Sequence, residues 1–561
     1  MVHVLGGNKS RDDDEVIPVM DPETSSQDTM LKGSAWMTAG SIFSRILGAI
    51  YIIPWMAWMG SDYPAANALF AKGYNIYSLF LIVSTAGIPG AISKQISHYN
   101  ALDQYSTGNK LFKHGLKIMT FMGVIFGAVM FFGAPVLATL FTDGDPRSIP
   151  VIKSLAVAVL IIPILSILRG YLQGYSDMAP SAISQFIEQI ARVIYMLIAT
   201  YIIMIVNKGS YINAVVQSTF AAFIGAAVAI AILVFAILKK LPKLRQLSRN
   251  GKPIENVNET NFTREIFEQA VPFIVLDAGI TFFNLFDQST FNQFMRMFVN
   301  ASSAQLDNYY SLFGFQANKL IMIIVSLSSA MAVTAVPILS GLYSKGDKDK
   351  IEDQISNTLE LFFFIMIPAS LGMYAVAQPL WTTFYRYDQL GVLMLQFSSV
   401  ISILLGLFTV LSAVLQALYR NKLAIKYFVY GLIVKVVVQL PMIGIFHEFG
   451  PLVATSIGMG VVSWLMLREL HAIYPFDTGR ISRRISGIIL FSLVMFVSVM
   501  FVNWVVFHFV GNSDRIISVV ALILEAGLGG VIYGYLVLKT SLADKIVGPK
   551  VGHIRTLLHM K

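Results

Sequence analysis

The stretch SAWMTAGSIFSRILGAIYIIPWMAWM, residues 34–59, is predominantly apolar and contains a single charged side chain, Arg45. About 20 helical residues cross the hydrocarbon core of a bilayer, so this stretch predicts a membrane-spanning helix. At about 1.5 Å per residue, Arg45 lies roughly 16 Å from the end of that helix. A cation at this depth is costly and usually faces an internal cavity, which suggests an anionic cargo.

The composition of the whole chain also indicates a membrane protein. Hydrophobic residues make up 56% of the 561 positions and charged residues 13%, about half the share found in soluble domains. The net charge of +9 does not indicate nucleic-acid binding, because the cations alternate with apolar segments in the manner of membrane loops. The chain has no cysteine, which excludes disulfides and thiolate metal sites.

A length of about 20 apolar residues per crossing divides the chain into fourteen expected helices, and the fold class is therefore an all-α polytopic membrane protein. The expected spans are 34–59, 69–96, 114–140, 151–172, 181–206, 211–238, 266–296, 309–340, 356–380, 393–418, 423–446, 450–470, 485–510 and 515–538.

The distribution of Lys and Arg predicts the orientation, because cytoplasmic loops retain positive charge. With the N-terminus inside, 30 of the 41 Lys and Arg residues fall in cytoplasmic segments and six in outer loops. Both termini are therefore expected in the cytoplasm.

Weak internal repeats divide the chain into two halves. LQGY at 172–175 matches LQAL at 415–418, and the same offset of 243 residues carries Arg192 onto Lys435. Six helices per half give parallel repeats, with a transport path expected between them. The expected units are a disordered cytoplasmic tail at 1–30, an N-lobe at 31–238, a linker at 239–265, a C-lobe at 266–470, a helix pair at 485–538 and a cytoplasmic tail at 539–561.

Four cations lie at membrane depth and are the candidates for binding an anionic substrate: Arg45, Arg192, Lys319 and Lys435. Neither Arg45 nor Lys319 has an acid one helical turn away, which favours contact with the cargo. Arg192 follows Glu188 by four residues, so a structural Glu188–Arg192 pair is an equal alternative. Lys435 is as well explained by packing between helices.

Three acids, Asp277, Asp287 and Glu525, also lie within apolar segments and are candidates for binding a coupling ion. The alternative is that each neutralises one of the cations, and the sequence does not separate the two. Pro89 and Pro337 occupy corresponding positions of the two halves and predict helix bends.

The sequence shows no motif that is typical of an enzyme. There is no P-loop, the eight histidines lack metal-ligand spacing, and no loop is long enough for a catalytic domain. We therefore expect no enzyme, no cofactor and no metal site.

Several motifs carry a family resemblance over residues 31–540. They are Ser44-Arg45-Ile46-Leu47-Gly48, AGIPGAISK at 86–94, and LRGYLQG at 168–174 followed by PSAISQ at 180–185 and Glu188-Gln189. This set resembles the polysaccharide-exporter branch of the multidrug and oligosaccharidyl-lipid exporter superfamily, and within it the YtgP group of MurJ-type lipid II flippases.

The resemblance implies two six-helix lobes around a cationic cavity, with the helix pair at 485–538 forming a groove for a lipid tail. It implies lipid II, an undecaprenyl diphosphate that carries the peptidoglycan precursor, as cargo moved from the inner to the outer leaflet by alternating access. Arg45 matches the first-helix arginine of the family, and Lys319 falls where the eighth helix has an arginine. Membrane lipids and cell-wall synthesis proteins are the implied partners, and the bacterial cell membrane is the implied location.

The chain departs from the family pattern at several positions. Tyr51 stands where some members have a second arginine, and Lys72 lies away from the usual second-helix arginine. Lys435 stands in the eleventh helix, which has no carboxylate where some members bind sodium, so sodium, protons and membrane potential stay open as the driving force.

Three other functions are alternatives to lipid II flipping. Another undecaprenyl-linked glycan, for capsule, teichoic acid or spore cortex, shares the diphosphate and the lipid. A multidrug exporter for cationic compounds should have an acidic cavity, which the midplane cations disfavour. A scaffold for cell-wall enzymes has no need of buried charges.

Overall fold

A computed structural model describes most of the chain. The described residues are 47–48, 50–85, 88–101, 103–175, 177–250, 274–510 and 514–547. They form helices connected by short turns and contain no strand.

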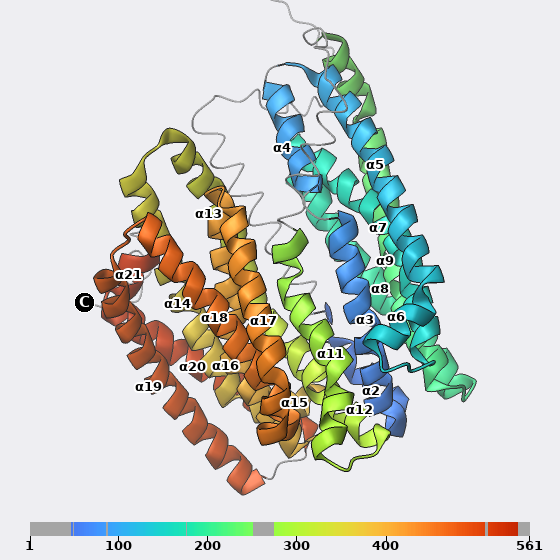
Figure 1. Cartoon of the computed structure of the whole chain (residues 1–561), viewed down its shortest axis with the longest axis vertical. Helices are drawn as coiled ribbons and strands as arrows, with labels where there is room; N and C mark the ends of the chain where they lie inside the picture. The colour runs from blue at the N-terminus through green and yellow to red at the C-terminus, as the bar shows by residue number, and fades with distance from the viewer. Residues whose placement is uncertain are drawn as a thin grey trace, which may run out of the picture.

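The first group of helices, α2–α9, forms a bundle that we call the N-bundle (Figure 1). Its elements are α2 (Ile52–Met59), η1 (Gly60–Asp62), α3 (Tyr63–Thr85), α4 (Ile88–Ala101), α5 (Tyr105–Phe132), α6 (Ala134–Phe141), α7 (Ser148–Gly174), α8 (Met178–Tyr201), η2 (Ile202–Val206) and α9 (Tyr211–Asn250).

The second group, α11–α18, forms the C-bundle, and two further long helices pack beside it. The elements of the C-bundle are α11 (Gly279–Phe298), α12 (Ser303–Ser311), η3 (Leu312–Ala317), α13 (Asn318–Lys345), α14 (Lys348–Ala375), α15 (Ala377–Phe384), α16 (Gln389–Ala417), α17 (Asn421–Phe446), η4 (His447–Phe449) and α18 (Gly450–Ile473). They are followed by α19 (Thr478–Val510), α20 (Arg515–Lys539) and the short α21 (Leu542–Val547).

The all-α membrane fold predicted from the sequence is confirmed. Ten helical stretches of the described residues are long and apolar enough to cross a membrane, and one of them, Asn421–Ile473, contains both α17 and α18. The expected count of fourteen crossings stays a prediction. Apolar side chains exposed to the surroundings, such as Phe235 at 71% and Val531 at 70%, are the surface that lipid would cover.

Small residues allow the helices of each bundle to pack closely. In the N-bundle, a Cβ on Gly123 of α5 would lie 2.4 Å from the carbonyl oxygen of Leu160 on α7, and Gly127 follows one turn later on the same face. In the C-bundle, Gly431 of α17 and Gly458 of α18 face each other's backbone in the same way. Close backbone approach at such residues is the usual basis of helix association in lipid.

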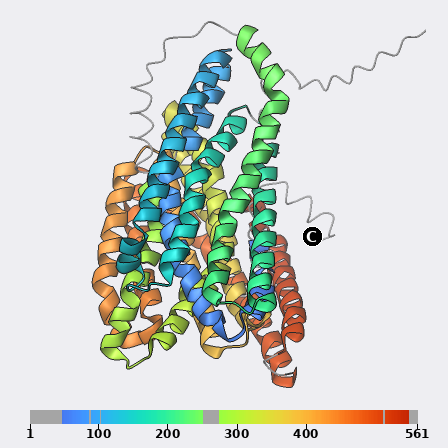
Figure 2. The same cartoon turned by 90° about the vertical axis from the view of Figure 1, so that its right-hand side faces the viewer.

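The two bundles meet at one end of the molecule and diverge towards the other (Figure 1). The contacts between them join α3 to α11, α12 and η3, α6 to α11, and α2 to α15. We call this the closed end. The turned view in Figure 2 shows α9 running the length of the molecule beside the other N-bundle helices. Helices α19 and α20 pack against α14 and α15, outside the contact between the bundles.

Several predicted crossings contain more than one helix. The second includes part of α3, which ends at Thr85, and part of α4, which begins at Ile88 and contains Pro89. The bend expected at Pro89 stays a prediction. The eighth comprises α12, the π-helical segment η3 and α13, and α13 stays helical past Pro337. The bend expected at Pro337 stays a prediction.

Candidate functional site

A cavity of about 330 Å³ lies between the two bundles, walled by α3 and α8 of the N-bundle and by η3 and α13 of the C-bundle. Two cations, three side-chain amides and several aromatic rings face it, and none of the described lining residues is acidic. The lining residues are Gly48, Tyr51, Phe70, Ala71, Tyr74, Asn75, Gln189, Arg192, Gly314, Phe315, Asn318, Lys319, Met322 and Ile323.

Arg192 reaches the cavity from α8. Its guanidinium carbon lies 5.5 Å from the centre of the Tyr74 ring on α3. A ring attracts a cation through its quadrupole, by about 0.5–2 kcal/mol, and carries no net charge that would neutralise it. Arg192 therefore keeps its full positive charge available to an anion in the cavity.

Lys319 reaches the same cavity from α13. Its ammonium donates a hydrogen bond to the Tyr51 hydroxyl and lies 3.9 Å from the centre of that ring and 5.0 Å from the Phe315 ring. The preceding segment, η3, is π-helical and places Gly314 and Phe315 at the cavity wall. Such π-helical turns are frequent at functional sites. The structure thus brings together two of the four predicted substrate cations, one from each bundle.

The motif at residues 168–188 forms a network between α7 and α8 and does not line the cavity. The Arg169 guanidinium donates to the Ser184 hydroxyl at 2.9 Å and to the Glu188 carboxylate at 2.7 Å. Gln173, one turn after Arg169, donates to the Ser181 hydroxyl at 3.0 Å. Within each helix these residues lie three or four positions apart, which places them on one helix face.

The pair expected between Glu188 and Arg192 stays a prediction, and the structure gives Glu188 a different partner. The Glu188 carboxylate is bound by Arg169 on the neighbouring helix, and no ion pair joins it to Arg192 within the described chain. Arg192 therefore has no acidic partner among the described residues, and it faces the cavity.

Lys435 lies away from the cavity and is fully buried. Its ammonium contacts Asp287 of α11 at 2.7 Å and the Thr455 hydroxyl of α18 at 2.6 Å. The structure therefore favours the packing alternative for Lys435 and the neutralising alternative for Asp287, because a buried ion pair satisfies both charges at once. The roles assigned to them in substrate and ion binding stay untested.

The remaining predicted residues are placed as follows. Arg45 lies outside the described residues. Asp277 is exposed, just before α11. Glu525 of α20 is fully buried and accepts hydrogen bonds from the Asn503 amide of α19 at 3.1 and 3.3 Å, so it belongs to the outlying helix pair and not to the cavity.

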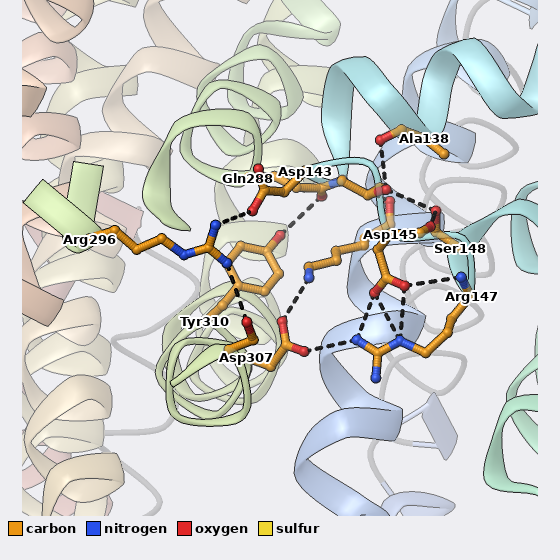
Figure 3. Close-up of polar contacts among 12 residues, drawn as sticks. Ala138, Asp143, Asp145, Arg147, Ser148, Gln288, Arg296, Asp307 and Tyr310 are labelled. Carbon is orange, nitrogen blue, oxygen red and sulfur yellow. Dashed lines mark hydrogen bonds and ion pairs between the residues drawn. The ribbon is translucent and has the colours of Figure 1, made fainter. Parts of the chain in front are cut away.

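A group of ion pairs joins the bundles at the closed end, and Figure 3 labels three of its members, Asp145, Arg147 and Asp307. The Lys72 ammonium of α3 contacts the Asp307 carboxylate of α12 at 2.8 Å, with side chains only 4% and 11% exposed. Arg147 contacts the other Asp307 oxygen at 3.2 Å and also Asp145 at 2.8 Å. We call these four residues, Lys72, Asp145, Arg147 and Asp307, the interbundle latch.

Further bonds support the latch. Gln288 of α11 donates to the backbone carbonyl of Lys72 at 3.0 Å, and Arg296 contacts Asp143 at 3.4 Å (Figure 3). Burial raises the pKa of Asp145, but hydrogen bonds from the side chain and backbone of Arg147 outweigh this effect and hold the pKa below its usual value. The Asp145 carboxylate is therefore charged near neutral pH.

Sequence reasoning missed the latch because Lys72 and Asp307 are 235 residues apart. It also missed the amides Gln189 and Asn318, which carry no charge to mark them within an apolar helix. The one available signal for these amides was their closeness in sequence to a predicted substrate cation. Gln189 precedes Arg192 by three residues, and Asn318 directly precedes Lys319.

Comparison with known proteins identifies the family. The family described as polysaccharide biosynthesis protein matches residues 30–343, more than half of the chain. The chain belongs to this family. It is also 31% identical over 536 residues to the lipid II flippase MurJ of Bacillus subtilis (strain 168), covering 93% of this chain and 97% of that protein. The predicted membership of the MurJ-type group is thereby confirmed.

Solved structures share the fold. A structure of the lipid II flippase MurJ in an inward closed conformation aligns with a TM-score of 0.59 at 14% identity, covering 89% of this chain and 99% of the other. The eukaryotic MATE transporter AtDTX14 aligns with a TM-score of 0.57 at 13% identity, covering 81% of this chain and 98% of the other. This chain therefore has the fold of a multi-pass membrane transporter.

Proposed function

We propose that this protein is a flippase that moves lipid II from the inner to the outer leaflet of the bacterial cell membrane. The observation that carries the proposal is the cavity between the bundles, whose described lining contains no acid and into which Arg192 and Lys319 project. The extensive similarity to a relative named lipid II flippase supports lipid II as the cargo.

The charge of the cavity suits a diphosphate. A diphosphate group offers only hydrogen-bond acceptors and negative charge, and its oxygens are bound well by Arg and Lys together. Neither cation is neutralised by a carboxylate in the described structure, so the ligand supplies the counter-charge. A transporter of cationic drugs needs the opposite polarity, which speaks against that alternative.

We assign the closed end to the outer face. This assignment follows from the excess of Lys and Arg in the segments expected inside, and it puts both termini in the cytoplasm. The cavity is then closed to the outside by the interbundle latch and receives cargo from the inner leaflet. Rocking of the bundles about the 239–265 linker would open the latch and release the cargo outside.

The C-terminal helix pair suits the lipid part of the cargo. Helices α19 and α20 pack on α14 and α15 through apolar side chains, among them Met495 and Val499, and lie outside the contact between the bundles. We propose that they guide the undecaprenyl chain while the diphosphate occupies the cavity. We propose that the protein acts without enzymatic chemistry.

The test is depletion of the protein in living cells, followed by identification of the lipid-linked intermediate that accumulates. Accumulation of lipid II in the inner leaflet, reversed by the wild-type chain, is the expected result. Re-expression of the Arg192→Gln variant, at matched abundance, should not reverse it. Accumulation of a capsule or teichoic acid precursor, with lipid II unchanged, would reassign the cargo to that glycan.

A further inference from the structure

Two side-chain amides in the cavity make no hydrogen bond to any described residue. They belong to Gln189 of α8 and Asn318 of α13, and both line the cavity. The third amide of the cavity, Asn75, behaves differently, because it donates to Gln288 at 3.0 Å and to Tyr310 at 3.1 Å and so helps to join the bundles. Unused amides facing a cavity are available to a ligand.

Each of these two amides lies beside a cation of the same bundle. Gln189 and Arg192 are three residues apart on α8 and therefore share one helix face. Asn318 directly precedes Lys319 at the start of α13. The cavity thus receives one amide and one cation from each bundle.

Amides and cations suit different parts of a ligand. A diphosphate has no hydrogen to donate, so its natural partners are Arg192 and Lys319. An amide both donates and accepts, which matches a hydroxyl or an acetamido group. In a glycosyl diphosphate the first sugar is bonded directly to the second phosphate, so its polar groups lie within reach of residues next to the cations.

We propose that Gln189 and Asn318 form a sugar-binding subsite that recognises the first, N-acetylated sugar of a glycosyl diphosphate. The subsite rests on the proposed function, since it requires a diphosphate held by the neighbouring cations. It adds a means of distinguishing loaded carrier lipid from the bare lipid diphosphate.

Gly48 provides the room that the subsite needs. A Cβ at this position would lie 3.4 Å from the Gln189 amide nitrogen, so a larger side chain would compete with a ligand for the same space. Because the two amides come from different bundles, the subsite is complete only when the bundles are close together. Recognition of the sugar is thereby coupled to the closed arrangement.

The experiment measures binding of two probes to the purified full-length chain in lipid nanodiscs. One probe is farnesyl diphosphate, and the other is farnesyl diphosphate that carries a single N-acetylhexosamine. At about 0.5–1.5 kcal/mol per hydrogen bond, the sugar-bearing probe should bind the wild-type chain about tenfold more tightly than the bare probe.

Variants of similar side-chain shape separate the subsite from the diphosphate site. Gln189→Met and Asn318→Leu should each weaken binding of the sugar-bearing probe about 3- to 10-fold and leave the bare probe unchanged. Arg192→Gln should weaken both probes. Gln185→Met, one turn earlier on α8 and outside the cavity lining, is the matched control and should change neither.

The possible contrary results are distinguishable. If the wild-type chain binds both probes equally, or if the amide variants weaken both probes to the same extent, the subsite is wrong and the diphosphate site stands. If the wild-type chain binds neither probe, the proposed function fails and the subsite fails with it.

Discussion

The interbundle latch makes a quantitative prediction about Asp307→Asn. In the closed arrangement Lys72 is 4% exposed and its ammonium lies 2.8 Å from Asp307, while Arg147 has a second carboxylate partner in Asp145. The substitution therefore leaves Lys72 as a buried cation without a carboxylate. Removing one partner of a buried ion pair costs about 3–5 kcal/mol.

That cost falls on the closed arrangement, because opening this end exposes Lys72 to water. A free-energy change of about 3 kcal/mol corresponds to a shift of roughly 100-fold in the equilibrium between closed and open ends. Neutralising both partners, in Lys72→Met with Asp307→Asn, should restore most of the closed population, since no unpaired charge remains.

The assay is a distance measurement between spin labels placed across the closed end. The chain has no native cysteine, so Ser61→Cys in the N-bundle and Asn300→Cys in the C-bundle give specific labelling sites. The distance distribution should broaden to longer values in Asp307→Asn. Asp177→Asn removes the partner of Lys240 within the N-bundle and is the matched control.

Two outcomes would refute this reasoning. One is an unchanged distance distribution in Asp307→Asn, which would mean that the ion pairs do not hold the bundles together. The other is an equal shift in the Asp177→Asn control, which would assign the effect to general destabilisation.

Three further predictions concern the cavity, the topology and the packing. Lys319→Ala should abolish exposure of lipid II at the cell surface at normal protein abundance, whereas Lys319→Arg should still expose lipid II. Full activity of the alanine variant would contradict a role of Lys319 in binding cargo. Single cysteines at Ser61 and Ser210 should react with impermeant thiol reagents in intact cells and one at Ser248 should not, and the reverse pattern would invert the orientation. Gly458→Leu should lower the thermal unfolding midpoint, because a Cβ there would lie 2.9 Å from the Gly431 carbonyl oxygen and overpacking costs about 1–3 kcal/mol. Gly460→Leu is the control and should leave the midpoint unchanged, because a Cβ there has nothing within 4 Å. Equal midpoints for the two variants would argue against close packing of α17 on α18.

The positions of the helices were within reach of the sequence alone. The expected spans 423–446, 450–470 and 515–538 correspond closely to α17 (Asn421–Phe446), α18 (Gly450–Ile473) and α20 (Arg515–Lys539). The physical reason is that the thickness of the hydrocarbon core sets the length of an apolar helix, and every backbone polar group must be bonded within it. The predicted family followed equally from local motifs.

The partners of the charged residues were decided only by the tertiary structure. Lys319 and Arg192, which the sequence singled out, meet in one cavity, whereas Lys435 is bound to Asp287 at a separation of 148 residues. Lys319 bonds to Tyr51 across 268 residues and Lys72 to Asp307 across 235. The depth of a charge in the membrane depends on its own helix and can be read from the sequence. Its partner depends on which helices pack together and at what rotation, and no local pattern encodes that choice.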